Sequence, residues 1–288
     1  MEKLPISVIA LSYNDEKIIG DCLKSVQGWV EDVFVVDSYS TDKTLNIIGR
    51  YTDNIHQHHF DNYAVQRNWA LNSLPVKTQW VLSLDADQRV TPELKKELFN
   101  VFSKGDPAVN GYIAGTKTVF MGRWIRHGGH YPIHRVYLLR KGKAQWEDRK
   151  YHQHCIIEGA TGRLESDVID VICSDLTTFV KRINTWSDSE AGEIFSGSDG
   201  GKIQARFFGD HIERKRWLRV KLYWRLPLFL RIFLYFFYRY VLLLGFLDGV
   251  EGFIFHFTQG LIFNFLVDAK IYEKRRAVKD LNSRKAQG

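Results

Sequence analysis

The chain has 288 residues, 45% of them hydrophobic, with a formal net charge of +7, so it can bury a core as one large domain or two small ones. Its three cysteines, Cys22, Cys155 and Cys173, are odd in number and lack metal-type spacing, so no disulfide framework is implied and we expect a reducing, cytosolic setting. The first ten residues, MEKLPISVIA, lack the regions of a secretory signal, so we expect none.

The first hundred residues alternate between strand and helix patterns. Apolar runs predict strands at 5–11, 32–37 and 79–85, with a short strand around Ile55. Helical spacing and capping residues predict helices at 15–29, 40–51 and 62–74, and another that begins at Thr91-Pro92. This alternation predicts an α/β fold with a mostly parallel, doubly wound sheet, in which ligands bind at the carboxyl ends of the strands.

The pattern changes after residue 110. Strands are expected at 111–120 and 135–142, separated by the loop MGRWIRHGGHYPIH, and a helix is expected at 175–195. The stretch SGSDGG (196–201) has the composition of a linker, so we predict one domain over 1–200 and a helical region over 201–288.

The helical region is both the most basic and the most apolar part of the chain. Residues 202–240 carry ten Lys/Arg and two acidic residues, so the remainder is close to neutral. The apolar run 226–247 is long enough to span a membrane, but Arg231 and Arg239 interrupt it, and each would cost about 2.5–3.5 kcal/mol near a bilayer centre. We expect both side chains to extend towards the headgroups.

These features predict helices that lie in the membrane interface and are attracted to anionic lipid by the basic stretch ERKRWLRVKLYWR. The second apolar run, 252–267, is shorter and carries polar residues. A buried helix pair, an oligomer interface through the C-terminal helices, and a spanning hairpin are the alternatives. Nucleic acid is disfavoured because large apolar side chains surround the charges.

The segment VLSLDADQRV places two carboxylates directly after a buried strand. Asp85 and Asp87 would repel each other unless a positive group lies between them, and hard oxygen ligands suit Mg²⁺ or Mn²⁺. Since Mg²⁺ is often held by one or two carboxylates and substrate phosphates, a phosphorylated ligand is implied. The alternative is a solvated turn that leads into the helix at Pro92.

Four segments in order resemble glycosyltransferase family 2, which has the GT-A fold: VIALSYNDEKIIGDCLKSV, VFVVDSYSTDKT, NYAVQRNWAL and WVLSLDADQRVTPEL. GRWIRHGG and GFLDG resemble the branch that builds lipopolysaccharide cores and exopolysaccharides. The resemblance implies a nucleotide-binding half over 1–100 and an acceptor half over 101–200. It also implies a nucleotide-diphospho-sugar donor, with UDP-type sugars favoured.

The resemblance also implies roles for individual residues. Asp37 would accept the N–H of the nucleotide base, and the loop at Ser12, Tyr13 and Asn14 would line the base and ribose. Arg67 would reach the base or the diphosphate. Asp85 would contact ribose and metal, and Asp87 would ligate the metal.

The general base is the least defined role. The segment WEDRKYH offers Asp148 first and Glu147 second, while His152 would ligate metal or hold the diphosphate. Close relatives carry a His-Glu pair where this chain has His152-Gln153, and Gln153 cannot act as a base. The loop with His127 and His130 could close over the sugar, or serve as an ordinary loop.

These observations predict an inverting, metal-dependent glycosyltransferase that extends a lipid-linked glycan, peripheral on the cytoplasmic face of the inner or plasma membrane. One alternative is a membrane-bound partner that binds nucleotide-sugar without turnover, which Gln153 favours. A second is a sugar nucleotidyltransferase, which the lack of glycine in LSYNDE disfavours.

Overall fold

The computed structural model describes residues 3–147, 153–172, 175–196, 217–218, 221 and 223–285. The chain divides into two compact units, and the second comprises 175–288 together with 127–129 and 149–152. The division lies near residue 175, earlier than the predicted boundary at 200. The reason is that α5 (Leu176–Ser196) packs along α9 (Phe263–Lys285) and belongs to the second unit.

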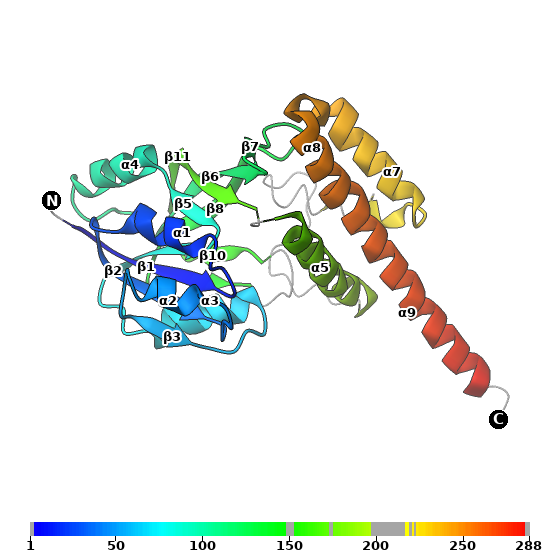
Figure 1. Cartoon of the computed structure of the whole chain (residues 1–288), viewed down its shortest axis with the longest axis horizontal. Coiled ribbons are helices and arrows are strands. Elements are labelled where there is room, and N and C mark those ends of the chain that lie inside the picture. The colour runs from blue at the N-terminus through cyan, green and yellow to red at the C-terminus, as the bar shows by residue number, and fades with distance from the viewer. Residues whose placement is uncertain are drawn as a thin grey trace. The chain divides into compact units, whose positions relative to one another are not determined.

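A mixed sheet with the order β3-β2-β1-β4-β8-β6-β11-β5 organises the first unit (Figure 1). The first four strands in this order are parallel to one another, and β6 is parallel to β11. Strand β8 runs antiparallel between β4 and β6, and β5 runs antiparallel to β11. The predicted mostly parallel α/β sheet is therefore confirmed. The strands of this sheet are β1 (Leu4–Ser12), β2 (Val30–Asp37), β3 (Ile55–Gln57), β4 (Trp80–Asp85), β5 (Gln88–Val90), β6 (Gly111–Phe120), β7 (Arg123–Trp124), β8 (Ile133–Arg140) and β11 (Thr161–Val171), and a separate hairpin pairs β9 (Ala144–Trp146) with β10 (Cys155–Ile157).

Helices cover both faces of the sheet. They bury the apolar side chains that β1 carries on each of its two faces. Ile6, Val8 and Ala10 of β1 share one buried cluster with residues of α1 and α4. Ile9 and Leu11 point to the opposite face and pack in a second cluster with residues of α3. A strand buried on both faces is typical of a parallel sheet. The helices of the first unit are α1 (Ile19–Val26), α2 (Thr44–Ile48), α3 (Tyr63–Ser73) and α4 (Pro92–Phe102).

The second unit does not fold its apolar run 226–247 into one helix. Helix α7 (Leu230–Phe237) continues as a π-helical turn, η2 (Tyr238–Leu242), and then the chain turns at Leu244, whose φ is 60°. Gly249, with φ 70°, begins α8 (Gly249–Phe255), which continues through the π-helical η4 (His256–Ile262) into α9. Short 3-10 turns complete the unit at η1 (Tyr223–Arg225) and η3 (Gly245–Asp248).

The two arginines of this run do not extend outward, so that expectation is wrong. Arg231 is 2% exposed and Arg239 is 8% exposed. Arg231 forms an ion pair with Asp268 of α9, and its Nε lies 3.0 Å from Asp268 Oδ1. Arg239 donates from Nε to the carbonyl oxygen of Gly128 at 2.8 Å. Both charges are therefore satisfied inside the unit.

Candidate active site

Three of the predicted site residues meet at the carboxyl edge of the parallel strands. The register places Ser12, the last residue of β1, beside Asp37, the last residue of β2. On the other side of β1, Leu11 pairs with Asp85, the last residue of β4. Asp87 follows two residues later, and its carbonyl accepts a hydrogen bond from Val171 N. The strand ends that the sequence placed at one edge therefore lie side by side in the first unit.

The loops after β1 and β2 are held together by side chains that cap backbone N–H groups. Asn14 N donates to Ser40 Oγ at 2.9 Å, and Thr41 N donates to Asn14 Oδ1 at 2.8 Å. The carboxylate of Asp37 is fully buried, and it accepts hydrogen bonds from Ser40 N at 2.9 Å and from Gln57 Nε2 at 3.3 Å. These bonds fix both loops at the sheet edge and orient Asp37.

Two tyrosines stand on these fixed loops with exposed rings. Tyr13 is 57% exposed and Tyr39 is 54% exposed, and Tyr39 has a φ of 61°, which is unusual for a bulky residue. Tyr13 was predicted from the sequence but Tyr39 was not, because no local pattern in SYST indicates that Tyr39 takes the left-handed conformation. Exposed aromatic rings on a rigid edge can stack against a flat ligand such as a nucleotide base.

Arg67 of α3 pairs with Asp85. Its Nη2 lies 2.7 Å from Oδ1 and 2.8 Å from Oδ2 of that carboxylate. The guanidinium also lies over the rings of Tyr63 and Trp146, with its carbon 5.2 Å and 5.7 Å from their centroids. We call the sheet edge that carries Ser12, Asp37, Asp85 and Asp87 the rim. Aromatic packing holds the Arg67 guanidinium at this rim, where it offsets the charge of Asp85.

The charges of Asp85 and Asp87 both shift the pKa values of the neighbouring Cys22 and Arg135. Burial raises the pKa of the Cys22 thiol most, and the charges of Asp87 and Asp85 raise it further. The pKa of the Arg135 guanidinium on β8 is raised by the neighbouring Tyr137 and Asp170 and by these two carboxylates. The rim therefore combines carboxylates with a second arginine, Arg135, which the sequence did not single out because it enters through the antiparallel strand β8.

The donor groups at this rim fit a hard divalent cation that is shared with a phosphorylated ligand. Within the described ranges, no group of three or more His, Cys, Asp and Glu side chains is arranged to hold a metal by itself. Asp85 and Asp87 supply two carboxylates, however, and Mg²⁺ is commonly bound by one or two carboxylates with substrate phosphates completing its shell. The fit thus depends on a ligand that brings its own oxygens.

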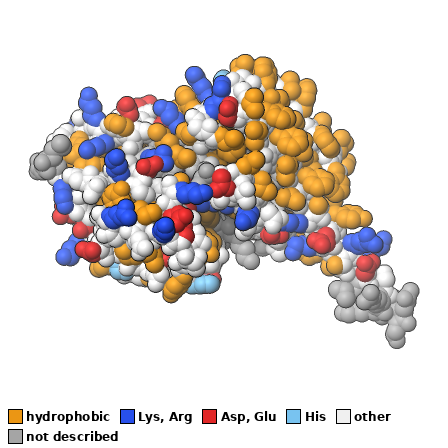
Figure 2. Space-filling view, viewed as in Figure 1, with side chains coloured by type: hydrophobic (Ala, Val, Ile, Leu, Met, Phe, Trp, Pro, Cys, Tyr) orange, Lys and Arg blue, Asp and Glu red, His pale blue; other side chains and the backbone are white. Residues whose placement is uncertain are grey.

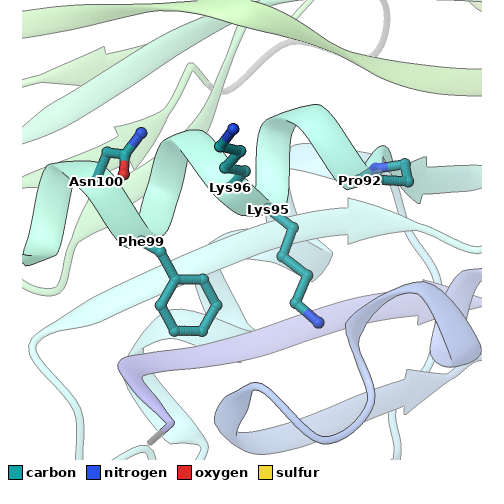
Figure 3. Close-up of a pocket in the computed structure, with 5 residues that line it drawn as sticks. All are labelled: Pro92, Lys95, Lys96, Phe99 and Asn100. Atoms are coloured by element: carbon teal, nitrogen blue, oxygen red, sulfur yellow. The ribbon is translucent and has the colours of Figure 1, made fainter. Parts of the chain in front are cut away.

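A separate depression of about 440 Å³ lies on α4 and has no acidic lining residue; it is lined by Pro92, Lys95, Lys96, Phe99 and Asn100 (Figure 3). Two of its residues pack against Trp29 of the first core cluster. The Lys95 ammonium lies 5.7 Å from the Trp29 ring centroid, and the Phe99 ring lies 6.3 Å from it. This depression is explained by packing of α4 on the core, so we do not assign it to the site.

The sheet and its acidic rim agree with comparisons to known proteins. The profile of "Glycosyl transferase family 2" matches residues 7–170, which is more than half of the chain and includes every rim residue described above. The chain belongs to this family. It is a family 2 glycosyltransferase with a GT-A-like fold.

Two relatives and one solved structure show how far the similarity extends. The lipopolysaccharide core biosynthesis glycosyltransferase LpsC of Rhizobium meliloti is 26% identical over 96% of this chain and 95% of its own length. An uncharacterized glycosyltransferase of Rickettsia felis is 34% identical over 36% of this chain and 35% of its own. The mannosyltransferase PcManGT of Pyrobaculum calidifontis, solved with GDP-Man and Mn²⁺, shares the fold at 14% identity with a TM-score of 0.51, over 94% of this chain and 88% of its own.

The family resemblance directs attention to the segment after β9, where a general base is expected. Glu147 is 1% exposed, and its carboxylate accepts a hydrogen bond from His154 N at 3.3 Å. Glu147 N in turn donates to the His154 carbonyl at 3.0 Å. Asp148 and His152 lie outside the described residues. The choice of Asp148 before Glu147 as the general base therefore stays a prediction.

The loop with the two candidate histidines splits between the units. His130 belongs to the first unit, where its Nε2 lies 2.8 Å from Thr118 Oγ1. His127 belongs to the second unit, where its Nδ1 lies 2.6 Å from Asp248 Oδ1 and its backbone N donates to Oδ2 at 2.8 Å. The motifs RHGG and GFLDG thus meet through His127 and Asp248, which gives a physical reason why the two segments occur together here.

Proposed function

We propose that this enzyme transfers a hexosyl group from a nucleotide-diphospho-sugar, of UDP type, to a hydroxyl of a lipid-linked glycan. The acceptor would be a lipopolysaccharide core or an exopolysaccharide or capsule precursor, presented at the cytoplasmic face of the inner or plasma membrane. The observation that carries the donor half is the rim, where Asp85 and Asp87 lie in one electrostatic environment with arginines. The end-to-end similarity to LpsC supports the acceptor half.

Donor binding would use the fixed loops and the arginines. Tyr13 and Tyr39 would stack on the base, and Ser12 and Asn14 would line the ribose. Asp37 would accept the base N–H, which requires the hydrogen bond from Gln57 or Ser40 to yield, because both donors now occupy its carboxylate. Arg67 and Arg135 would face the diphosphate, whose charge they complement.

Asp87 and Asp85 would hold Mg²⁺ or Mn²⁺, which when bound supplies positive charge to the leaving diphosphate. Arg67 would hold the Asp85 carboxylate in position, because its Nη2 contacts both carboxylate oxygens. Arg135 would place a second positive charge near the same diphosphate. The chain's own residues thereby lower the cost of developing charge on the leaving group.

The transfer itself would be a single in-line displacement. The acceptor oxygen forms a bond to the anomeric carbon while the bond from that carbon to the diphosphate oxygen breaks, and the diphosphate leaves with the electron pair. The acceptor proton passes to a carboxylate, with Asp148 as first candidate and Glu147 as second. Attack from the face opposite the leaving group inverts the anomeric configuration. His152 would assist by holding the diphosphate.

One observation favours a second candidate function. Gln153 occupies the place where the resembling branch carries a glutamate, and an amide cannot accept the acceptor proton. A protein that binds nucleotide-sugar at a membrane without transferring it would tolerate this change. Turnover by the purified chain separates the two candidates.

The decisive experiment is the variant Asp87→Ala, assayed by Mn²⁺-dependent release of nucleoside diphosphate from a panel of nucleotide-sugars. Loss of a ligand that stabilises leaving-group charge should reduce release by on the order of 10²–10³-fold. Asp53→Ala, at an exposed position outside the rim, is the matched control and should leave release unchanged. Normal release by Asp87→Ala would contradict the assignment, and no release by the wild-type chain with any donor would favour the binding partner.

A further inference from the structure

The second unit exposes many large apolar side chains on its helices. We call this set the apolar face: Leu230, Phe233, Leu234, Phe237, Tyr238, Val241, Leu242, Leu244, Phe246, Leu247, Val250, Phe253 and Phe257. Phe233 is 61% exposed, Leu242 is 61% exposed and Val250 is 70% exposed. Figure 2 shows hydrophobic side chains gathered where Figure 1 places α7, α8 and the start of α9. Contiguous apolar surface of this kind marks an interaction site on a soluble protein.

Three of the four charged side chains within the same stretch are buried. Residues 226–266 contain four ionised side chains, of Arg231, Arg239, Asp248 and Glu251. The first three are at most 8% exposed, and Glu251 is partly exposed. Arg231 forms an ion pair with Asp268, and Asp248 accepts a hydrogen bond from the backbone N of His127, with the ring Nδ1 of His127 2.6 Å from its Oδ1. Because the charged groups of Arg231, Arg239 and Asp248 find partners inside the unit, the surface can enter the membrane interface without exposing them, and the partly exposed Glu251 would lie at headgroup level.

Basic residues adjoin this face in the sequence. From 269 to 285 the chain has seven Lys/Arg and two acidic residues, and Lys274, Arg275, Arg276 and Lys279 of α9 are all exposed. Residues 214–225, just before the face, have six Lys/Arg and no acidic residue. An apolar face with cationic segments at both ends is complementary to an anionic bilayer surface. A second copy of the chain would instead bring like charges together.

The unit also shows how the face would meet a bilayer. Residues 245–280 form a stretch of helix long and apolar enough to cross a membrane by length and composition. However, Lys270 of α9 pairs with Asp188 of α5 at 2.7 Å and donates to Ser187 Oγ at 2.8 Å. A spanning orientation would carry this polar contact with α5 towards the hydrocarbon. Insertion of α7 and α8 alone avoids that cost.

We propose that the apolar face is a docking surface for the anionic leaflet of a lipid bilayer, entered in the plane of the interface by α7, η2, η3 and α8. The cationic part of α9 then rests against the headgroups. This inference rests on the proposed function only for the reason why docking would be useful, because the enzyme must reach a lipid-linked acceptor at the membrane. The surface itself is argued from the second unit alone.

The test is flotation of the purified full chain with two kinds of vesicle, phosphatidylcholine alone and phosphatidylcholine mixed with the anionic lipid phosphatidylglycerol. The wild type should float with the anionic vesicles. Leu234→Glu combined with Phe237→Glu places two charges on the apolar face and should weaken partitioning by on the order of 10²-fold. Val180→Glu, at an exposed apolar position on α5 outside the apolar face, is the control and should float like the wild type.

A second variant tests the electrostatic part. Replacing Lys274, Arg275, Arg276 and Lys279 by Gln should weaken binding to the anionic vesicles by on the order of 10-fold or more, with little change on neutral ones. Circular dichroism and nucleoside diphosphate release with a soluble acceptor would confirm that each variant is folded.

Three outcomes would overturn the proposal: a wild-type chain that stays at the bottom of the gradient, a discrete dimer that does not float, or equal losses in Val180→Glu and the double variant. Asp87→Ala should float normally although it lacks turnover. Failure of docking and failure of the proposed function are therefore read separately.

Discussion

The two units distribute charge and apolar surface in opposite ways. In the first, Val81, Leu82 and Leu84 are buried inside the sheet and the carboxylates of Asp85 and Asp87 follow at its rim. In the second, Arg231 and Asp268 are buried while phenylalanine and leucine side chains face outward. The first arrangement suits water and a charged ligand, whereas the second suits a surrounding of low polarity. This difference in surface is what the proposed docking of the second unit on a bilayer requires.

Breaking the buried pair of the second unit should have the largest effect on stability. Asp268→Asn leaves the buried Arg231 without its counter-charge, and loss of one partner from such a pair typically costs about 3–5 kcal/mol. Urea unfolding in a mild detergent would measure it. The matched control is Glu158→Gln in the exposed pair with Lys143 of the first unit, which should change the free energy of unfolding by less than about 1 kcal/mol. Equal effects at both sites would erase the contrast between the units.

The equivalent ion pair at the rim should matter for activity more than for stability. Arg67→Ala removes the partner of Asp85 and a cation facing the proposed diphosphate, so we expect kcat/KM to fall on the order of 10²-fold. Arg67→Lys keeps the charge but loses the stacking on Tyr63 and Trp146, and should recover part of the rate. A large loss of stability with an unchanged rate would show that Arg67 is merely a structural residue.

The sequence predicted the first unit better than the second for a physical reason. Strand endings place Ser12, Asp37 and Asp85 at one edge because parallel strands share a direction, and this follows from local patterns alone. Strand pairing does not: Arg135 joins the rim only because β8 inserts antiparallel beside β4. The sequence therefore indicated the acidic half of the rim and missed part of its basic half.

In the second unit, contacts between residues far apart in the chain determine where the arginine side chains point, and the local sequence pattern could not predict these contacts. The run 226–247 reads as one helix because Leu244 gives no sign of its left-handed conformation, and only Gly245 and Gly249 hint at a turn. Arg231 finds its partner 37 residues away in Asp268. The arginines were therefore expected to extend outward, when the turn in the chain allows them to be paired inside.

Buried His256 should make the second unit sensitive to pH. Burial first, and the charges of Arg239 and His127 in addition, lower the pKa of this imidazole to about 4, although the carboxylate of Asp248 raises it. The unfolded chain takes up a proton near pH 6.5 and the folded chain does not, so stability is full above that pH and falls as the pH drops towards 4.

Between pH 7 and pH 5 this one group should cost about 2 kcal/mol. Thermal unfolding of the wild type and of His256→Gln at both values would isolate it. The variant should lose less stability on acidification, and parallel pH profiles would contradict the assignment.

The smallest expected effect belongs to a neutral cap next to the rim. Thr91 Oγ1 accepts a hydrogen bond from Leu94 N at 3.1 Å and donates one to the Asp167 carbonyl at 3.0 Å, so it starts α4 and ties it to β11. Thr91→Ala should reduce the free energy of unfolding by about 1 kcal/mol, and Thr91→Ser, which keeps the hydroxyl, should restore most of it. Only the short strand β5 separates Asp87 from this cap, so a change at Thr91 could also displace Asp87. The rate of nucleoside diphosphate release in Thr91→Ala tests this. A fall in rate larger than the fall in stability would show that the cap also positions Asp87, and hence that the rim is held from its carboxyl side by α4.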